Sequence, residues 1–431
     1  MNVEIIIYSV ASFYGNEEIG NLVNEMFKNH NILIFKGSGN DGPFYTSVRK
    51  IDSNVMDSIF NIGALLTSEM QKKIYYATIS EEANSHPPIV YNFSSRGPGE
   101  NGSRGLDFVA PGAAISYAPR FAFEEKKCFV GTSCSSPNAA GAVACLLSGL
   151  KAKSIEYSPA LIKFALFKTA FLPKNVNIFE FGHGIIQINE AFEYFCKKIN
   201  DLNSVPNQLN GSYGASFTLL NGQDQNVTER DFNLSDFING NKDAKKWIIQ
   251  VSKNAENFIS VSEINEKNLF TVKVDTNKLE AGNFYFGEII ILHPKIGSIL
   301  NIPVFICYPI KVTETKNLHI QKEITLTSES PFRFVIYPFF KSSKVPCEIA
   351  VIALQKLRTN ICIQNVEYNN RFQSIVDRDP KKILKFSTKN QIETYSFTLE
   401  KPEIQEICIF STVATSLKSN AKLRIELSFK N

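Results

Sequence analysis

The sequence is poor in the features that mark secreted, membrane and nucleic-acid-binding proteins. Its 8 cysteines are scattered singly, without a C-x-x-C pair, which excludes a disulfide scaffold and indicates thiols in a reducing compartment. No run approaches the roughly 18 apolar residues of a transmembrane helix, and the opening MNVEIIIYSV lacks the basic start of a signal peptide. A net charge of +4 is too small for an electrostatic footprint. We expect a cytoplasmic protein without nucleic-acid or membrane partners.

Composition and length indicate an ordinary folded chain. Hydrophobic residues make up 44% and charged residues 20%, which excludes a disordered or fibrous protein. With domains of roughly 100–200 residues, the 431 residues predict two or three domains. Neither a fixed-period repeat nor a low-complexity tract interrupts the chain.

The hydrophobic pattern changes near residue 200. Before it, apolar Val3–Val10 and Ile32–Phe35 flank a stretch with helical spacing, so the sequence predicts a strand, a helix and a parallel strand. The apolar positions of that helix are Ile19, Leu22, Val23, Met26 and Phe27. Further predicted elements are strands at Ser58–Leu66 and Ile74–Ile79, a helix at Ser135–Leu150 and a polar linker at Lys197–Gly214.

After residue 205 the apolar residues alternate as in strands. The clearest predicted strands are Trp247–Ser252, Leu269–Val274, Phe284–Leu292, Ile299–Cys307, Glu348–Gln355, Ile392–Leu399 and Leu423–Phe429. We therefore predict an α/β domain over 1–199, a β-sandwich over 205–312 and a second sandwich or jelly roll over 313–431. Residues 205–431 hold no clustered metal ligands and no phosphate loop, so we expect no active site and no cofactor there.

The stretch Gly131-Thr132-Ser133-Cys134-Ser135-Ser136-Pro137 precedes the predicted helix. Its small residues let the chain turn sharply and expose Ser133 at a helix N-terminus, where partial positive charge favours a developing oxyanion. The alternative is an ordinary N-cap serine beside small packing residues. A second stretch, Gly37-Ser38-Gly39-Asn40 followed by Asp-Gly-Pro, comes directly after a predicted strand. An asparagine there is a turn residue or a hydrogen-bond donor.

Together these stretches resemble the serine box and the G-N loop of subtilisin-like peptidases. Phe93–Pro98 and Val109–Gly112 are similar to framework segments that lie between the two motifs in that family. The resemblance implies that Ser133 is the nucleophile and that Asn40 and the Ser133 N–H hold the oxyanion. It also implies that a peptide substrate lies against Ser9-Val10-Ala11 and Gly37-Ser38-Gly39. In the first segment Ala11 replaces the glycine that is usual in the family, and Lys36 directly precedes the second segment.

Three further segments narrow the resemblance to the tripeptidyl-peptidase II type: Ser148–Ala152, Gly182–Gln187 and Gly282–Glu288. That resemblance implies a peptidase that needs no cofactor or metal, releases tripeptides from polypeptide N-termini and assembles into homo-oligomers. Trp247, Phe284, Phe286 and Phe332–Phe340 exceed the needs of one small sandwich, so we expect contacts with the catalytic domain and with neighbouring subunits.

The base and the acid of the triad have no counterparts at the expected places. Subtilisins order their triad Asp, His, Ser, yet the residues before Asn40 contain no H-G-T-H box and only His30, at a helix end. We expect the chain to begin inside the catalytic domain, with Asp and His supplied by a separate segment. Because loss of the histidine costs a subtilisin about 10⁶-fold in kcat, the chain alone should be nearly inert.

Two other readings stay open from the sequence. One is a non-catalytic pseudoprotease or β-sandwich assembly module, which the missing Asp and His favour and the intact serine box disfavours. The other is an α/β-hydrolase that uses His183 after Ser133, although G-T-S-C-S differs from G-x-S-x-G. His86 lies in a Ser-His-Pro-Pro loop after Asn40, which is the wrong side for the base of a subtilisin.

Overall fold

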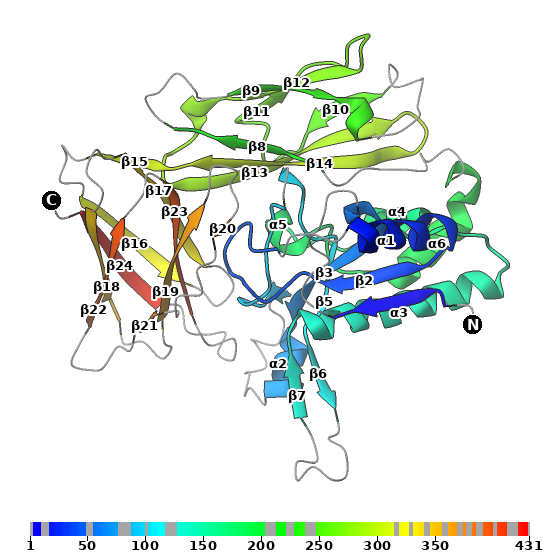
Figure 1. Ribbon diagram of the computed structural model, residues 1–431, viewed down its shortest axis with the longest axis horizontal. Coiled ribbons are helices and arrows are strands. Elements are labelled where there is room, and N and C mark those ends of the chain that lie inside the picture. The colour runs from blue at the N-terminus through cyan, green and yellow to red at the C-terminus, as the bar shows by residue number, and fades with distance from the viewer. Residues whose placement is uncertain are drawn as a thin grey trace.

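The computed structural model describes residues 3–9, 17–48, 55–75, 88–99, 102–116, 127–202, 213–220, 228–237, 247–313, 319–326, 331–339, 345–355, 361–368, 374–375, 382–384, 391–399, 403–411 and 421–429. A mainly parallel sheet with helices forms the first part, and strands form the rest (Figure 1). This confirms the predicted α/β fold followed by β-domains.

A five-stranded sheet forms the centre of the first part. Its strands are β1 (Ile5–Tyr8), β2 (Leu33–Gly37), β3 (Ile59–Leu66), β4 (Ile89–Val90) and β5 (Phe108–Pro111). Strands β1, β2, β3 and β5 run parallel in that spatial order, and the short β4 pairs antiparallel with the end of β3. All of β3 is buried, as expected for a parallel strand covered on both faces. The C-terminal ends of β2, β3 and β5 share one edge, where loops with functional residues gather in such sheets.

Helices cover both faces of this sheet. They are α1 (Glu17–Asn29), α2 (Ser68–Tyr75), α3 (Thr132–Ala152), α4 (Pro159–Thr169), α5 (Ile178–Phe181) and α6 (Ile188–Leu202). Helix α3 packs on the face that presents the stacked rings of Phe35 and Phe60, 4.7 Å apart. Helix α1 covers the opposite face through Val23, which packs with Ile34 and Ile59. The alternation of strand side chains thus gives each face its own apolar core.

A hairpin leads from the sheet into α3. Its strands β6 (Ala113–Ser116) and β7 (Lys127–Val130) pair antiparallel and stand away from the sheet (Figure 1). The hairpin returns the chain to its starting point, because the Gly131 N–H donates to the Gly112 carbonyl at 2.9 Å. Helix α3 therefore begins beside the C-terminal end of β5.

Seven strands follow in two sheets, ordered β10-β13-β14-β8 and β11-β12-β9. Their bounds are Ala215–Thr218 (β8), Glu229–Asn233 (β9), Ile248–Val251 (β10), Ile259–Val261 (β11), Leu269–Val274 (β12), Asn283–His293 (β13) and Gly297–Tyr308 (β14). Their buried residues join the core cluster of the first part, so Phe217 and Ile302 belong with Ala165 and Phe195. The two parts share one apolar core.

The remaining strands form a second pair of sheets. They are β15 (Ile310–Thr313), β16 (His319–Leu326), β17 (Phe332–Phe339), β18 (Val345–Ala353), β19 (Ile361–Tyr368), β20 (Ser374–Ile375), β21 (Lys382–Leu384), β22 (Ile392–Leu399), β23 (Ile404–Ser411) and β24 (Ala421–Phe429). One sheet is ordered β15-β17-β23-β19 with β20 and β21 on β19, and the other β16-β24-β18-β22. The predicted contact between aromatic strand residues and the first part of the chain is present in β13. The ring of Phe284 lies edge-on to the ring of Tyr45, with 5.0 Å between the ring centres.

Two predicted boundaries are wrong. Ile74, predicted in a strand, lies in α2, whose first turn is capped by Thr67 Oγ1 accepting from Met70 N and whose Glu69 pairs with Lys73; residues 76–79 lie outside the described residues. The predicted linker from Lys197 begins inside α6, because apolar residues at helical spacing, including buried Phe195, extend that helix.

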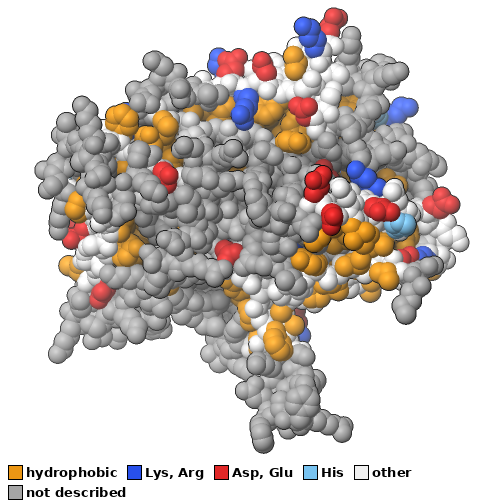
Figure 2. Space-filling view, viewed as in Figure 1, with side chains coloured by type: hydrophobic (Ala, Val, Ile, Leu, Met, Phe, Trp, Pro, Cys, Tyr) orange, Lys and Arg blue, Asp and Glu red, His pale blue; other side chains and the backbone are white. Residues whose placement is uncertain are grey.

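The apolar face of α1 is also less buried than predicted. Ile19 and Leu22 are 41% and 53% exposed, and Ile7 of β1 is 48% exposed. Among the described residues, β1 pairs only with β2, so the side of the sheet beyond β1 is open. Figure 2 shows apolar side chains gathered on this side of the molecule.

Candidate active site

The end of β2 and the start of α3 meet at the shared edge of the sheet. A Cβ atom on Gly37 would lie 2.9 Å from both the carbonyl oxygen and Oγ1 of Thr132. Real Cβ atoms do not approach that closely, so only glycine lets the strand pass the helix here. This contact brings the Gly37–Asn40 loop against the serine box.

Thr132 fixes the Asn40 carboxamide. Asn40 Oδ1 accepts hydrogen bonds from Thr132 N and Thr132 Oγ1, each at 3.0 Å, and Gly39 N donates to Thr132 Oγ1 at 3.3 Å. A Cβ built on Gly131 would lie 3.5 Å from Asn40 Nδ2, 3.7 Å from Ser133 N and 3.8 Å from Asn40 Oδ1. The Asn40 carboxamide and the Ser133 backbone N–H therefore lie close to each other beside Gly131.

Ser133 is exposed in the first turn of the 21-residue helix α3, where the helix dipole is positive. Its Oγ lies 3.4 Å from the Ser9 carbonyl, and Ser9 Oγ lies 3.4 Å from the Ser133 carbonyl. The structure therefore brings together Ser133, Asn40, Ser9 and Gly37–Gly39. Val10 and Ala11, the other predicted substrate contacts, lie outside the described residues.

A model of the Subtilase family matches residues 1–215. Residues 1–215 belong to the subtilase family. Tripeptidyl-peptidase 2 of Caenorhabditis elegans is 33% identical over 196 residues, which are 45% of this chain and 14% of that protein. The Drosophila melanogaster tripeptidyl-peptidase 2 is 35% identical over 184 residues, 43% of this chain and 12% of that protein. The subtilase domain is therefore of the tripeptidyl-peptidase II type.

A solved structure extends the likeness to the β-domains at the level of fold. The crystal structure of tripeptidyl peptidase 2 is 20% identical, with a TM-score of 0.69, and the match covers 99% of this chain and 34% of that chain. The chain thus spans about a third of that structure and a smaller share of the relatives.

The remaining motifs of the subtilase domain brace the loop before Pro43. Ser95 N donates to the Gly39 carbonyl at 3.0 Å, and Asp41 N donates to Ser95 Oγ at 3.0 Å. Ser94 Oγ accepts from Ala64 N at 3.0 Å, which ties the same segment to β3. These contacts support the framework role predicted for Phe93–Pro98.

Main-chain groups along the predicted substrate strand are partly used within the protein. Gly39 donates through N–H to Thr132 and accepts through C=O from Ser95. Ser38 N donates to the Ile62 carbonyl at 2.9 Å, and the buried Lys36 Nζ donates to the Gly37 carbonyl at 2.9 Å. Both backbone groups of Gly39 are thus hydrogen-bonded within the protein, and these bonds fix the conformation of the loop.

His183 lies at the wrong end of the sheet to serve Ser133. Its N–H donates to the carbonyl of Asp107, just before β5, whereas Gly112, just after β5, meets Gly131. Five residues of strand span about 17 Å. The His183 ring packs against Phe167 at 4.4 Å, and burial, followed by the charges of Arg104 and Lys163, holds its pKa well below the ordinary value. The α/β-hydrolase reading is therefore wrong.

The other described histidines are also remote. His30 follows α1 and pairs with exposed Glu25 at 3.5 Å, His293 lies 6.0 Å from the Trp247 ring, and His319 begins β16. His86 lies outside the described residues. Within the described ranges, no histidine or carboxylate contacts Ser133 Oγ.

The part of the chain that the structure describes holds no group of three or more His, Cys, Asp or Glu side chains that could bind a metal ion. None of the helices in this part is both long and apolar enough to cross a membrane. The sequence reasoning missed Thr132 as the residue that orients Asn40, although the threonine stands in the serine box itself.

Proposed function

We propose that this chain carries the nucleophile and the oxyanion site of a tripeptidyl-peptidase II type serine peptidase. The observation that carries the proposal is that Ser133 N and the Asn40 carboxamide lie close together beside Gly131, next to the exposed Ser133 Oγ. An oxyanion hole needs two such preorganised donors next to the attacking oxygen.

In the proposed reaction, Ser133 Oγ attacks the peptide carbonyl carbon and its proton passes to a histidine oriented by an aspartate. The carbonyl π electrons move onto oxygen, where Asn40 Nδ2 and Ser133 N stabilise the negative charge. When the intermediate collapses, the C–N bond breaks and the amine takes the proton, leaving an acyl-enzyme for water to hydrolyse. We infer that the histidine and aspartate come from outside the described residues, in a further segment or chain.

The substrate we propose is a polypeptide N-terminus, from which tripeptides are released. Support comes from the names of the relatives and from the position of Ser9, Gly37 and Ser38 beside Ser133. We also propose a cytoplasmic homo-oligomer, with domains over 1–199, 205–312 and 313–431, of which the first two share one apolar core. The free thiols are consistent with the compartment, and the exposed apolar edge at β1 is consistent with assembly.

A fluorophosphonate probe tests this function. We expect no labelling and no peptidase activity from the chain alone, because no base contacts Ser133 Oγ among the described residues. Joining a segment that supplies Asp and His should restore both, and Ser133→Ala should abolish both, whereas Ser135→Ala, a buried neighbour, should retain labelling. Labelling of Ser133 in the chain alone would contradict the incomplete site. Failure of every such segment would favour a non-catalytic assembly module.

A further inference from the structure

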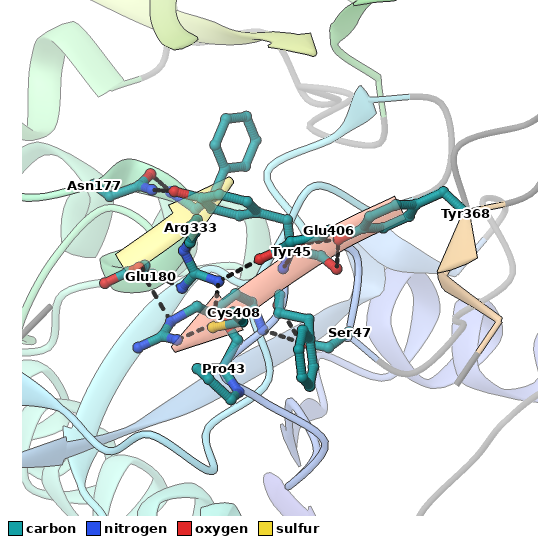
Figure 3. Close-up of polar contacts among 12 residues, drawn as sticks. Pro43, Tyr45, Ser47, Asn177, Glu180, Arg333, Tyr368, Glu406 and Cys408 are labelled. Carbon is teal, nitrogen blue, oxygen red and sulfur yellow. Dashed lines mark hydrogen bonds and ion pairs between the residues drawn. The ribbon is translucent and has the colours of Figure 1, made fainter. Parts of the chain in front are cut away.

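A buried group of charged and aromatic side chains joins the loop after Asn40 to strands near the C-terminus (Figure 3). Tyr45 comes from the loop, Arg96 from the framework segment and Glu180 from α5. The β-strands contribute Arg333 (β17), Tyr368 (β19), Glu406 and Cys408 (β23). These residues are far apart in sequence, and we found no signal for the group in the sequence alone.

The charges of this group form an alternating, buried chain. Arg96 Nε lies 3.2 Å from Glu180 Oε1, Arg333 Nη2 lies 3.3 Å from the same oxygen, and Arg333 Nη1 lies 2.7 Å from Glu406 Oε1. The side chains of Arg96 and Glu406 are 0% exposed. A buried ion pair stabilises a fold no better than apolar packing, but it fixes geometry because an unpaired charge there is costly.

All of the polar atoms of Tyr45 are hydrogen-bonded, the backbone atoms by this group and the hydroxyl by Asn177, which precedes α5. Its N–H donates to Glu406 Oε2 at 3.4 Å, its carbonyl accepts from the Tyr368 hydroxyl at 3.2 Å, and its own hydroxyl accepts from Asn177. The Arg333 guanidinium lies 4.4 Å from the centre of its ring. The Tyr368 hydroxyl has one hydrogen, which it shares between the Tyr45 carbonyl and Glu406. Burial, and then Glu406, raise the pKa of Tyr368 well above its ordinary value, so the phenol keeps the proton it donates.

A hydrogen-bonded stretch of backbone connects Tyr45 to Asn40. Residues 41–48 run along residues 93–97, with Gly42 N donating to Phe93 O at 2.9 Å and Thr46 N to Gly97 O at 3.1 Å. Arg96 Nη1 also donates to the Pro43 carbonyl at 2.6 Å. The loop therefore has one end at the oxyanion site and the other end clamped by a carboxylate 361 residues away in sequence.

We propose that Glu406, with Arg333, is a positioning residue for Asn40 that acts through Tyr45. The last β-domain thereby holds the oxyanion loop in its working geometry, and the β-domain is part of the catalytic apparatus without touching substrate. This inference rests on the proposed function for its catalytic consequence, whereas the restraint on the loop can be measured without any activity.

Hydrogen exchange of the full chain tests the restraint. In Glu406→Gln, the amides of residues 39–48 should exchange at least tenfold faster than in the unmodified chain, because the amide side chain no longer neutralises Arg333. Amides of residues 143–150 in α3 should be unchanged. The matched control is Glu323→Gln, since Glu323 pairs with Arg424 at 2.7 Å but is 59% exposed; it should leave residues 39–48 unchanged.

Two results would overturn the inference: unchanged exchange at residues 39–48, or an equal increase at residues 143–150, which would indicate general destabilisation. Tyr368→Phe keeps the ring and removes only the hydroxyl on Tyr45 and Glu406. If Glu406→Gln fails to fold, this variant must show a smaller increase confined to residues 39–48, and its absence also overturns the inference.

The catalytic consequence is tested in the enzyme restored with Asp and His. Glu406→Gln should lower kcat about tenfold with KM unchanged, and it should add nothing in an Asn40→Ala background, because both changes remove the same stabilisation. Additive losses would show that Glu406 acts elsewhere. If Asn40→Ala alone leaves kcat unchanged, the proposed function fails while the exchange result on the loop still stands.

Discussion

Among single residues, Thr132 does more for the site than its place in a run of small residues suggests. A hydroxyl has one donor and two acceptor positions, and Thr132 Oγ1 uses the donor on Asn40 Oδ1 and an acceptor position on Gly39 N. Because its backbone N–H binds the same Oδ1, the Asn40 carboxamide has only one orientation that satisfies both bonds. The orientation of the Asn40 Nδ2 donor is therefore fixed by Thr132 within the protein itself.

In the restored enzyme, Asn40→Ala should lower kcat by about 10²–10³, the cost known for loss of one oxyanion donor. KM should change little, because the lost hydrogen bond forms in the transition state. Steady-state kinetics on a peptide substrate provides the measurement, with Asn254→Ala, an exposed asparagine in the β-region, as the control. An effect of Asn40→Ala on KM alone would mean that Asn40 is only a turn residue.

His183 gives the chain a pH-dependent stability. Its folded pKa is held well below the ordinary 6.5 by burial, so below about pH 6.5 the unfolded chain binds a proton that the folded chain does not. The free energy of unfolding should therefore fall between pH 7.5 and pH 5. Urea denaturation should show a smaller fall for His183→Gln, whereas His30→Gln at an exposed position should match the unmodified chain. Equal falls in all three proteins would remove His183 as the source.

At the scale of elements, the strands of the β-domains were predicted more accurately than the short elements of the subtilase domain. The predicted strands Leu269–Val274 and Ile392–Leu399 match β12 and β22 residue for residue. Apolar and polar residues alternate in both, and their β-branched and aromatic side chains favour a strand over a helix. The strand prediction failed at Ile74 and Tyr75, where a short apolar run has no periodicity of its own and the capped helix α2 includes both residues.

The crossing of β2 and α3 should be intolerant of one methyl group. Gly37→Ala places a Cβ 2.9 Å from Thr132 backbone and side-chain atoms, so we expect a loss of about 1–3 kcal/mol in the free energy of unfolding. Gly141→Ala is the control, since a Cβ there meets nothing within 4 Å in the middle of α3. It should stabilise the chain by about 0.5–1 kcal/mol. Equal stabilities of the two variants in denaturant titrations would show that the loop yields without cost.

For the whole molecule, the sequence predicted the order of the parts but not how they join. The Gly-Asn loop and the serine box are local patterns, so Asn40 and Ser133 could be named before the fold was known. The contact of Glu406 with Tyr45 spans 361 residues and depends on how two parts far apart in the sequence pack against each other. A lone Glu in an apolar strand carries no sign of which partner it meets.

Residues 205–431 expressed alone should fold as β-rich material without peptidase activity and should self-associate. Their strands are paired within their own sheets, so we expect the strand structure to persist. Removal of the subtilase domain opens the shared apolar core and uncovers Phe284 and Phe305, whose ring centres lie 5.0 and 5.4 Å from that of Tyr45. It also removes Glu180 and with it the Glu180–Arg333 ion pair, which leaves the Arg333 guanidinium beside a newly exposed apolar patch.

Circular dichroism of this fragment should show strand structure, and sedimentation velocity across micromolar concentrations should show species larger than a monomer. Phe284→Ser should reduce that association, whereas substitution of Phe258, whose ring packs against Tyr285 and not against Tyr45, should not. A strictly monomeric fragment would contradict the association and leave the β-fold untouched.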